Sequence, residues 1–190
     1  AIEFGMLLVT DNNDTSLITT DDISYTAVTA SVGNASFTGI SGLTATVSEV
    51  SFAMNKNSID PLVDADGANA VLDFVDTPSS PNDSGSTDFA LPGSNLSLSI
   101  DANEGALLEV IATLSLDVFG FLTLNGTFGF KKANSTFYRT NPSETNPALR
   151  TTSFNADYLA IGGSVDSAFV GAAGIGFEVT GLDFGVLLVT

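Results

Sequence analysis

The sequence predicts an all-β fold, an elongated antiparallel β-sandwich or barrel of long, bent strands, with a β-solenoid as the alternative. Thr, Ser, Val, Gly, Asn and Phe are frequent, whereas Gln is absent and Lys and Arg together number 5. These are the residue types of strands and turns. Apolar and polar residues also alternate over two long segments, as in strands with one buried face. Parallel solenoids show a short, even repeat that this sequence lacks, so the antiparallel architecture is favoured.

The first and last ten residues have nearly the same sequence. Residues 1–10 read AIEFGMLLVT and residues 181–190 read GLDFGVLLVT, so the two segments lie 180 residues apart. We interpret residues 1–190 as a single unit of a tandem array with a period of about 180 residues, plus a short overlap. The array predicts that the parent chain continues after Thr190 with a segment close to DNNDTSLITTDD. The alternative is a pair of similar edge strands in one closed domain.

A weaker similarity lies inside the unit. The segment that starts at Tyr25 resembles the segment that starts at Tyr158, and after one deletion Phe52 aligns with Phe184. We interpret this as one pair of long strands used more than once. Convergence on a common strand pattern is the alternative.

The clearest alternation covers residues 108–130, where every even position is apolar or Gly, and a second alternating segment covers residues 159–181. Either segment would measure about 75 Å if it were one straight strand, which is far longer than most strands. Each is therefore predicted to bend at a glycine that permits a bulge or a corner. The candidates are Gly120, Gly163, Gly171 and Gly174.

Two polar stretches, residues 55–106 and 131–157, interrupt this pattern. Together they contain all six Pro residues, and the second stretch contains four of the five basic residues. We predict that both are loop-rich insertions on a β-core, where binding residues are often found.

The charge and composition exclude several classes of function. A net charge of −17 opposes binding to nucleic acid, which needs clustered Lys and Arg, and opposes docking on an anionic membrane. The chain has no Cys and no His, which excludes disulfides and the usual zinc and copper sites. No apolar run is long enough for a transmembrane helix, so membrane insertion is not expected.

Clustered Asp and Asn residues predict a calcium site, because calcium prefers six to eight hard oxygen ligands supplied by tight loops. Solvated acidic turns are the alternative. The stretch from Asp64 to Gly67 resembles the start of a helix-loop-helix calcium loop, but its Gly is misplaced and no Glu closes it. The candidate ligands are Asp11, Asn13, Asp14, Asp60, Asp64, Asp66 and Asn69.

The sequence does not predict an enzyme. It contains no GxSxG motif, no P-loop and no Gly-rich turn that opens a helix. Paired carboxylates could in principle hydrolyse glycosides, but the chain has no Trp and only three Tyr to stack on sugars.

The phrases FLTLNGTFGFKK, GLDFGVLLVT and SVDSAFVGAAGIGFEV resemble repeats of giant, acidic, Cys-free bacterial surface proteins of the RTX-adhesin type. The resemblance covers most of the β-rich part, but the glycine-rich calcium nonapeptide of that group is absent. It implies an extracellular protein exported by type I secretion to the bacterial cell surface. The expected function is a structural or adhesive repeat that extends a filament, with neighbouring copies of itself as partners. The alternative is a module whose loops bind a carbohydrate or a host protein.

Overall fold

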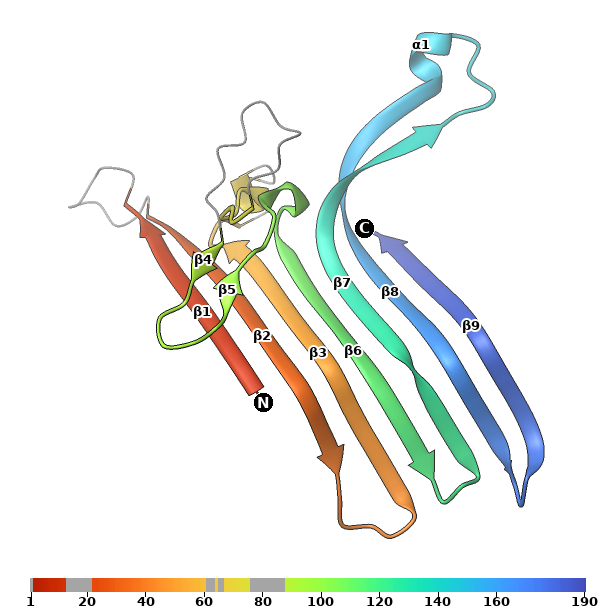
Figure 1. The fold of residues 1–190 in the computed structure, drawn as a ribbon. Helices are drawn as coiled ribbons and strands as arrows, with labels where there is room; N and C mark the ends of the chain where they lie inside the picture. The colour runs from red at the N-terminus through yellow and green to blue at the C-terminus, as the bar shows by residue number, and fades with distance from the viewer. Residues whose placement is uncertain (1, 13–21, 61–63, 65–66, 76–87) are drawn as a thin grey trace.

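A computed structural model describes residues 2–12, 22–60, 64, 67–75 and 88–190, most of which belong to one seven-stranded antiparallel sheet (Figure 1). The order of its strands follows the chain, so each strand pairs with its predecessor and successor in the sheet. The strands are β1 (Ile2–Asp11), β2 (Ile23–Phe37), β3 (Leu43–Asn57), β6 (Leu107–Val118), β7 (Leu122–Thr140), β8 (Thr151–Ala172) and β9 (Ile175–Val189).

The predicted all-β, antiparallel fold class is confirmed. A second sheet contains only β4 (Phe89–Ala90) and β5 (Ser97–Leu98), and the helices are the short η1 (Gly67–Asn69), η2 (Ala102–Glu104) and α1 (Pro147–Arg150). Among the described residues the large sheet is open, because β1 and β9 lie at its opposite edges (Figure 1). It forms neither a closed barrel nor a solenoid.

The two long alternating segments are hairpins, and the prediction that each is one continuous, bent strand is wrong. Phe119 and Gly120 have φ angles of 54° and 69°, and Ala173 and Gly174 have φ angles of 53° and 77°. Consecutive residues with positive φ reverse the chain in tight hairpin turns. The alternation continues through the turns, so the sequence pattern does not reveal them.

Of the four expected glycines, Gly120 and Gly174 lie in the two turns, whereas Gly163 and Gly171 lie within β8. The strands themselves have bulges at other positions. The pairing of β3 with β6 shifts between Ser48 and Ser51, where Glu49 has a φ of 52°. The pairing of β7 with β8 shifts between Asn125 and Gly126. Such bulges increase the local twist of a sheet, and Figure 1 shows the long strands curving along their length.

Residues 131–157 form much less loop than predicted. β7 and β8 remain paired as far as Thr140 and Thr151, so residues 141–150, which include α1, make the only connection. This end of the hairpin projects beyond the rest of the sheet (Figure 1). The ring of Phe137 lies 6.0 Å from that of Phe154 and 5.9 Å from that of Tyr158, so aromatic contacts stabilise its base.

The two faces of the large sheet differ in polarity, because paired residues share a face and successive residues alternate. We call one the apolar face. It contains the residues in register with the even positions of β6 from Leu108 to Val118, and at the edges it presents Ile2, Phe4, Met6 and Leu8 of β1 and Leu182, Phe184, Val186 and Leu188 of β9.

The opposite face, which we call the polar face, is in register with Glu109, Thr113, Ser115 and Asp117 of β6. One end of it is covered by the described part of residues 55–106. The buried core lies there, between the segment that contains β5 and the large sheet; its members are Ala27, Phe74, Leu98, Ile100, Leu107 and Ala133. This buried cluster therefore occupies only part of one face, and two further buried residues, Val28 and Val165, lie on the apolar face.

Candidate functional site

The most distinctive feature of the fold is the equivalence of its two edge strands. In β1, Val9 pairs with Tyr25 and Leu7 pairs with Ala27. In β9, the corresponding Val189 pairs with Tyr158 and Leu187 pairs with Ala160.

The match continues toward the other end of each edge strand. Glu3 pairs with Ser31 and Asp183 pairs with Ser164, so an acidic residue lies opposite a serine in both pairs of strands. The repeated decapeptide therefore occupies the same register on its neighbour at both edges of the sheet.

The equivalent strands also point in the same direction. Successive strands alternate in direction, and six strand-to-strand steps separate β1 from β9. The two strands are therefore parallel to each other, with their outer edges facing opposite sides of the sheet (Figure 1). If β9 served as the first strand of a second unit, a strand equivalent to β2 would lie on its outer edge.

A small residue between two phenylalanines recurs in both outer thirds of the apolar face. Ala30 pairs with Phe4 on one side and Phe52 on the other, and Gly163 pairs with Phe128 and Phe184. A β-carbon on Gly163 would lie 2.6 Å from the ring of Phe184, so the rings fill this space. The internal similarity between the segments at Tyr25 and Tyr158 thus corresponds to equivalent positions in the sheet.

The outer edge of β9 offers backbone groups for pairing. The amide of Thr190 donates to the carbonyl of Asp157 on the β8 side. Backbone groups alternate between the two sides of a strand, so the amides of Gly185, Leu187 and Val189 point outward. β9 has no Lys and no Pro, which are the residues that commonly block an exposed edge.

Only some of the predicted calcium ligands belong to the part of the chain that the structure describes. Asn13, Asp14 and Asp66 lie outside the described residues, as does the side chain of Asn69. The described candidates are Asp11, Asp60 and Asp64, and in the part of the chain that the structure describes no group of three acidic residues could hold a metal ion.

Asp64 has a local structural role. Its carboxylate accepts a hydrogen bond of 2.9 Å from the amide of Gly67, and its carbonyl accepts one of 3.0 Å from the amide of Ala68. These contacts hold Asp64 against the first two residues of η1. The calcium prediction stays a prediction.

Thermal unfolding with excess EDTA and with millimolar calcium tests the predicted calcium site. A ligand that binds only the folded state at 100 times its Kd adds about 2.7 kcal/mol of stability. For a chain of this size the Tm would then rise by about 5–10 °C. We expect that rise with calcium and not with equal magnesium, and an unchanged Tm would assign the Asp residues to a solvated surface.

A shallow polar depression lies beside η2, on the projecting hairpin. Its lining includes Asn103, Asn134, Thr136 and Asn155. Thr136 donates to Asn155 over 2.7 Å, so two of the polar groups already satisfy each other. No aromatic ring lines it, and it therefore lacks the stacking platform that a sugar-binding site would need.

Lys131 forms a charged cluster that ties η2 to the sheet. Its ammonium forms an ion pair with Glu104 of η2 and lies 3.5 Å from Glu109, its partner on β6. Burial lowers the pKa of Lys131, but the hydrogen bond and charge of Glu104, with the charges of Tyr158 and Glu109, leave it raised above 10.5. Lys131 thus acts structurally.

Replacing Lys131 with Met should lower the free energy of unfolding by about 0.5–1 kcal/mol near pH 7, because the ion pairs are lost while the apolar stem remains. A raised folded-state pKa means that the stabilisation is present below pH 10.5 and is lost as pH rises through the folded-state pKa. In denaturant titrations from pH 7 to 11, the difference in free energy of unfolding between the unsubstituted protein and Lys131→Met should therefore decrease at high pH. A constant difference would contradict the ion-pair explanation.

The apolar face is the main feature of the sheet that the sequence does not predict. The alternation in residues 108–130 predicts one apolar side, but it does not indicate which other strands contribute or what covers them.

None of the helices in the described ranges has the length and apolar character that a bilayer span requires. Comparison of the chain with protein-family models, curated proteins and solved structures finds no match.

Proposed function

We propose that this chain is a non-catalytic structural repeat that extends a filament by continuing one β-sheet from copy to copy. The observation that carries the proposal is the equivalence of β1 and β9 in sequence, register and direction. In such an array the decapeptide is shared: it is the last strand of one unit and the first strand of the next. Each unit then adds six strands, or about 29 Å of sheet at a spacing of about 4.8 Å.

The setting we propose is extracellular, as part of a large, acidic protein secreted to the surface of a bacterium. The absence of Cys and the net charge of −17 support this setting, because an acidic surface keeps a chain rich in β-structure soluble and repels other filaments. Neighbouring copies are the proposed partners. The alternative, a module that presents residues 55–106 or 131–157 to a carbohydrate or a host protein, stays a prediction.

A chain of two units, residues 1–190 followed by residues 11–190, keeps residues 181–190 as the junction strand and tests the proposal. If the junction strand is shared, the two units should unfold in one transition whose denaturant slope is about twice that of one unit, because the slope scales with the surface exposed. Two transitions, or one transition with the slope and midpoint of a single unit, would mean that the units are independent domains.

Two proline variants at the junction provide a matched control. The amide of Leu187 points to the outer edge, so Leu187→Pro should change a single unit little and should uncouple the two units. The amide of Val186 points to β8, so Val186→Pro should destabilise both chains. This contrast is expected because Pro is tolerated in a strand only where its missing N–H would face solvent. Equal effects in the single unit would contradict the assigned edge.

A further inference from the structure

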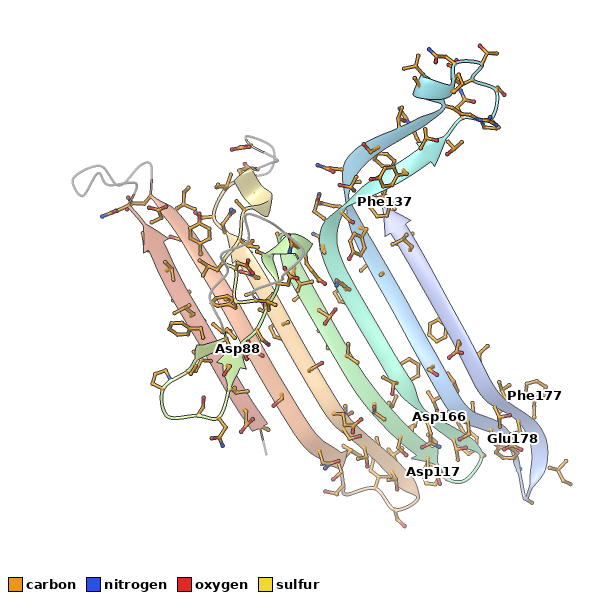
Figure 2. The ribbon with its side chains drawn as sticks, turned by 45° about the horizontal axis from the view of Figure 1, so that its top comes forward. Asp88, Asp117, Phe137, Asp166, Phe177 and Glu178 are labelled. Atoms are coloured by element: carbon orange, nitrogen blue, oxygen red, sulfur yellow. The ribbon has the colours of Figure 1, made fainter. Side chains whose placement is uncertain are left out.

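The apolar face has no cover among the described residues. The segments that contain β5, η1 and η2 pack on the polar face, where their contacts include Ala27 and Leu107. On the apolar face, Phe4 is 63% exposed, Phe184 is 43% exposed and Phe177 is 69% exposed, and Figure 2 shows Phe177 at the outer strand. Soluble monomers seldom expose contiguous apolar patches of more than a few hundred Å².

The size of this face suits a large interface. Seven strands, with the 12 residues of β6 as a typical length, give an area of roughly 1,200 Å² at a spacing of about 4.8 Å and a rise of about 3.3 Å per residue. A standard stable interface uses about 800 Å² per partner. A partner must therefore offer a broad, flat, apolar surface.

Charge indicates what that partner is. Positions in register with Leu108–Val118 of β6 carry one charged side chain, Lys132, which lies at the rim. Glu109, Asp117 and Glu178 lie on the polar face. Asp157 is on the apolar side but lies beyond Leu159, outside these positions. Two copies that meet through their apolar faces keep these acids on opposite outer surfaces, so the repulsion between two chains of charge −17 is smallest in that arrangement.

We propose that the apolar face is covered by the same face of a second copy of this chain, which makes a two-layered sandwich. Sheets that pack face to face lie about 10 Å apart, with strand directions within about 30° of each other. The second copy has the same area, the same aliphatic and Phe composition and the same rim. This inference goes beyond the proposed extender role, because it concerns the faces of the sheet, whereas the array concerns its edges.

The mass of a single unit in solution is the first test. Light scattering should give twice the 19.5 kDa of one chain at micromolar concentration. Leu114→Lys, in the middle of the apolar face, should give a monomer, whereas Ser115→Lys, the adjacent residue on the polar face, should leave the dimer intact. The proposal would be overturned if the unsubstituted unit were monomeric, or if the two variants had equal effects on its mass.

Two single-cysteine variants on β9, Val186→Cys and Leu187→Cys, keep the test valid if Leu114→Lys fails to fold. The chain has no Cys, and Val186 and Leu187 are 50% and 54% exposed on opposite faces of one copy. The thiol of Val186→Cys should react with an alkylating reagent at least about tenfold more slowly than that of Leu187→Cys, and dilution should remove the difference. If the two thiols reacted at equal rates at high protein concentration, the proposal would be overturned. It would also be overturned if the thiol of Val186→Cys were protected only in the presence of neutral lipid vesicles, because the apolar face would then bind lipid.

The outcomes separate the two proposals. Dimerisation of the single unit with independent unfolding of the two-unit chain would support the covered face and reject the continuous sheet. Coupled unfolding of the two-unit chain, together with a freely reactive thiol in Val186→Cys, would support the continuous sheet and reject the covered face.

Discussion

Replacement of Leu98 with Ala should lower the free energy of unfolding by about 2–4 kcal/mol, the cost of a truncated leucine in a packed core. Leu98 is 0% exposed and, in β5, belongs to the only buried hydrophobic cluster of the described residues. The core is small, so few other contacts can compensate for the cavity. Denaturant unfolding measures the change.

Leu149→Ala is the matched control, because Leu149 of α1 is 59% exposed. It should change stability by less than about 0.5 kcal/mol, as surface substitutions generally do. If both variants lost the same stability, or if Leu98→Ala lost none, the segment containing β5 would not form the second layer of the fold.

Replacement of Gly126 with Ala should lower the free energy of unfolding by about 1–3 kcal/mol, as overpacking of a close contact does. Gly126 lies at the bulge between β7 and β8. A β-carbon there would lie 2.5 Å from the carbonyl oxygen of Ser164 and 3.0 Å from the α-carbon of Val165. Both are backbone atoms of the neighbouring strand, so the strands must separate locally.

Gly129→Ala on the same strand separates this clash from the general effect of losing a glycine. The nearest atoms to its β-carbon would be 3.8 Å and 4.0 Å away, which is ordinary contact. Alanine restricts the unfolded chain more than glycine does, so Gly129→Ala should be neutral or stabilising by up to about 1 kcal/mol. A loss at Gly129 equal to that at Gly126 would show that strand glycines matter for another reason than close approach.

The sequence predicts the fold class because alternation with period two is a direct consequence of strand geometry. The same period explains the principal error. At the first turn Val118 pairs with Leu122, so the even positions stay on one face and the hairpin keeps the pattern of a single strand. At Ala173–Gly174 the pairing of Ala172 with Ile175 shifts the alternation by one residue, and the bulge between β7 and β8 offsets that shift. Only the positive φ that favours Gly at the second position marks the reversal, and Gly also occurs within strands, as at Gly163.

The candidate site was partly predictable. The near identity of residues 1–10 and 181–190 identifies the repeated strand, but only the pairing shows that Val9 and Val189 lie opposite equivalent tyrosines. The calcium site stays a prediction; of its candidate ligands, Asp64 accepts a hydrogen bond from the amide of Gly67. Composition alone cannot distinguish a carboxylate that holds a turn from a metal ligand.

The two proposals together describe a ribbon of antiparallel strands that grows through its edges and is covered on its apolar face by a second ribbon. Its polar faces would be outermost. Figure 2 shows Asp117, Asp166 and Glu178 at the end of the sheet that carries the hairpin turns, away from the projecting hairpin with Phe137. The acidic groups would thus line one side of such a filament, and the projecting hairpins the other.

Hydrogen exchange at the shared strand tests the continuous sheet most directly. In a single unit, the amides of Gly185, Leu187 and Val189 face the free edge and should exchange quickly, whereas the amides of Val186 and Leu188 bond to β8 and should exchange slowly. In a chain of two units, the amides of the first set, at the junction, should become protected by at least about tenfold, because local opening governs exchange. Unchanged exchange of Leu187 and Val189 at the junction would contradict a sheet shared between neighbouring copies.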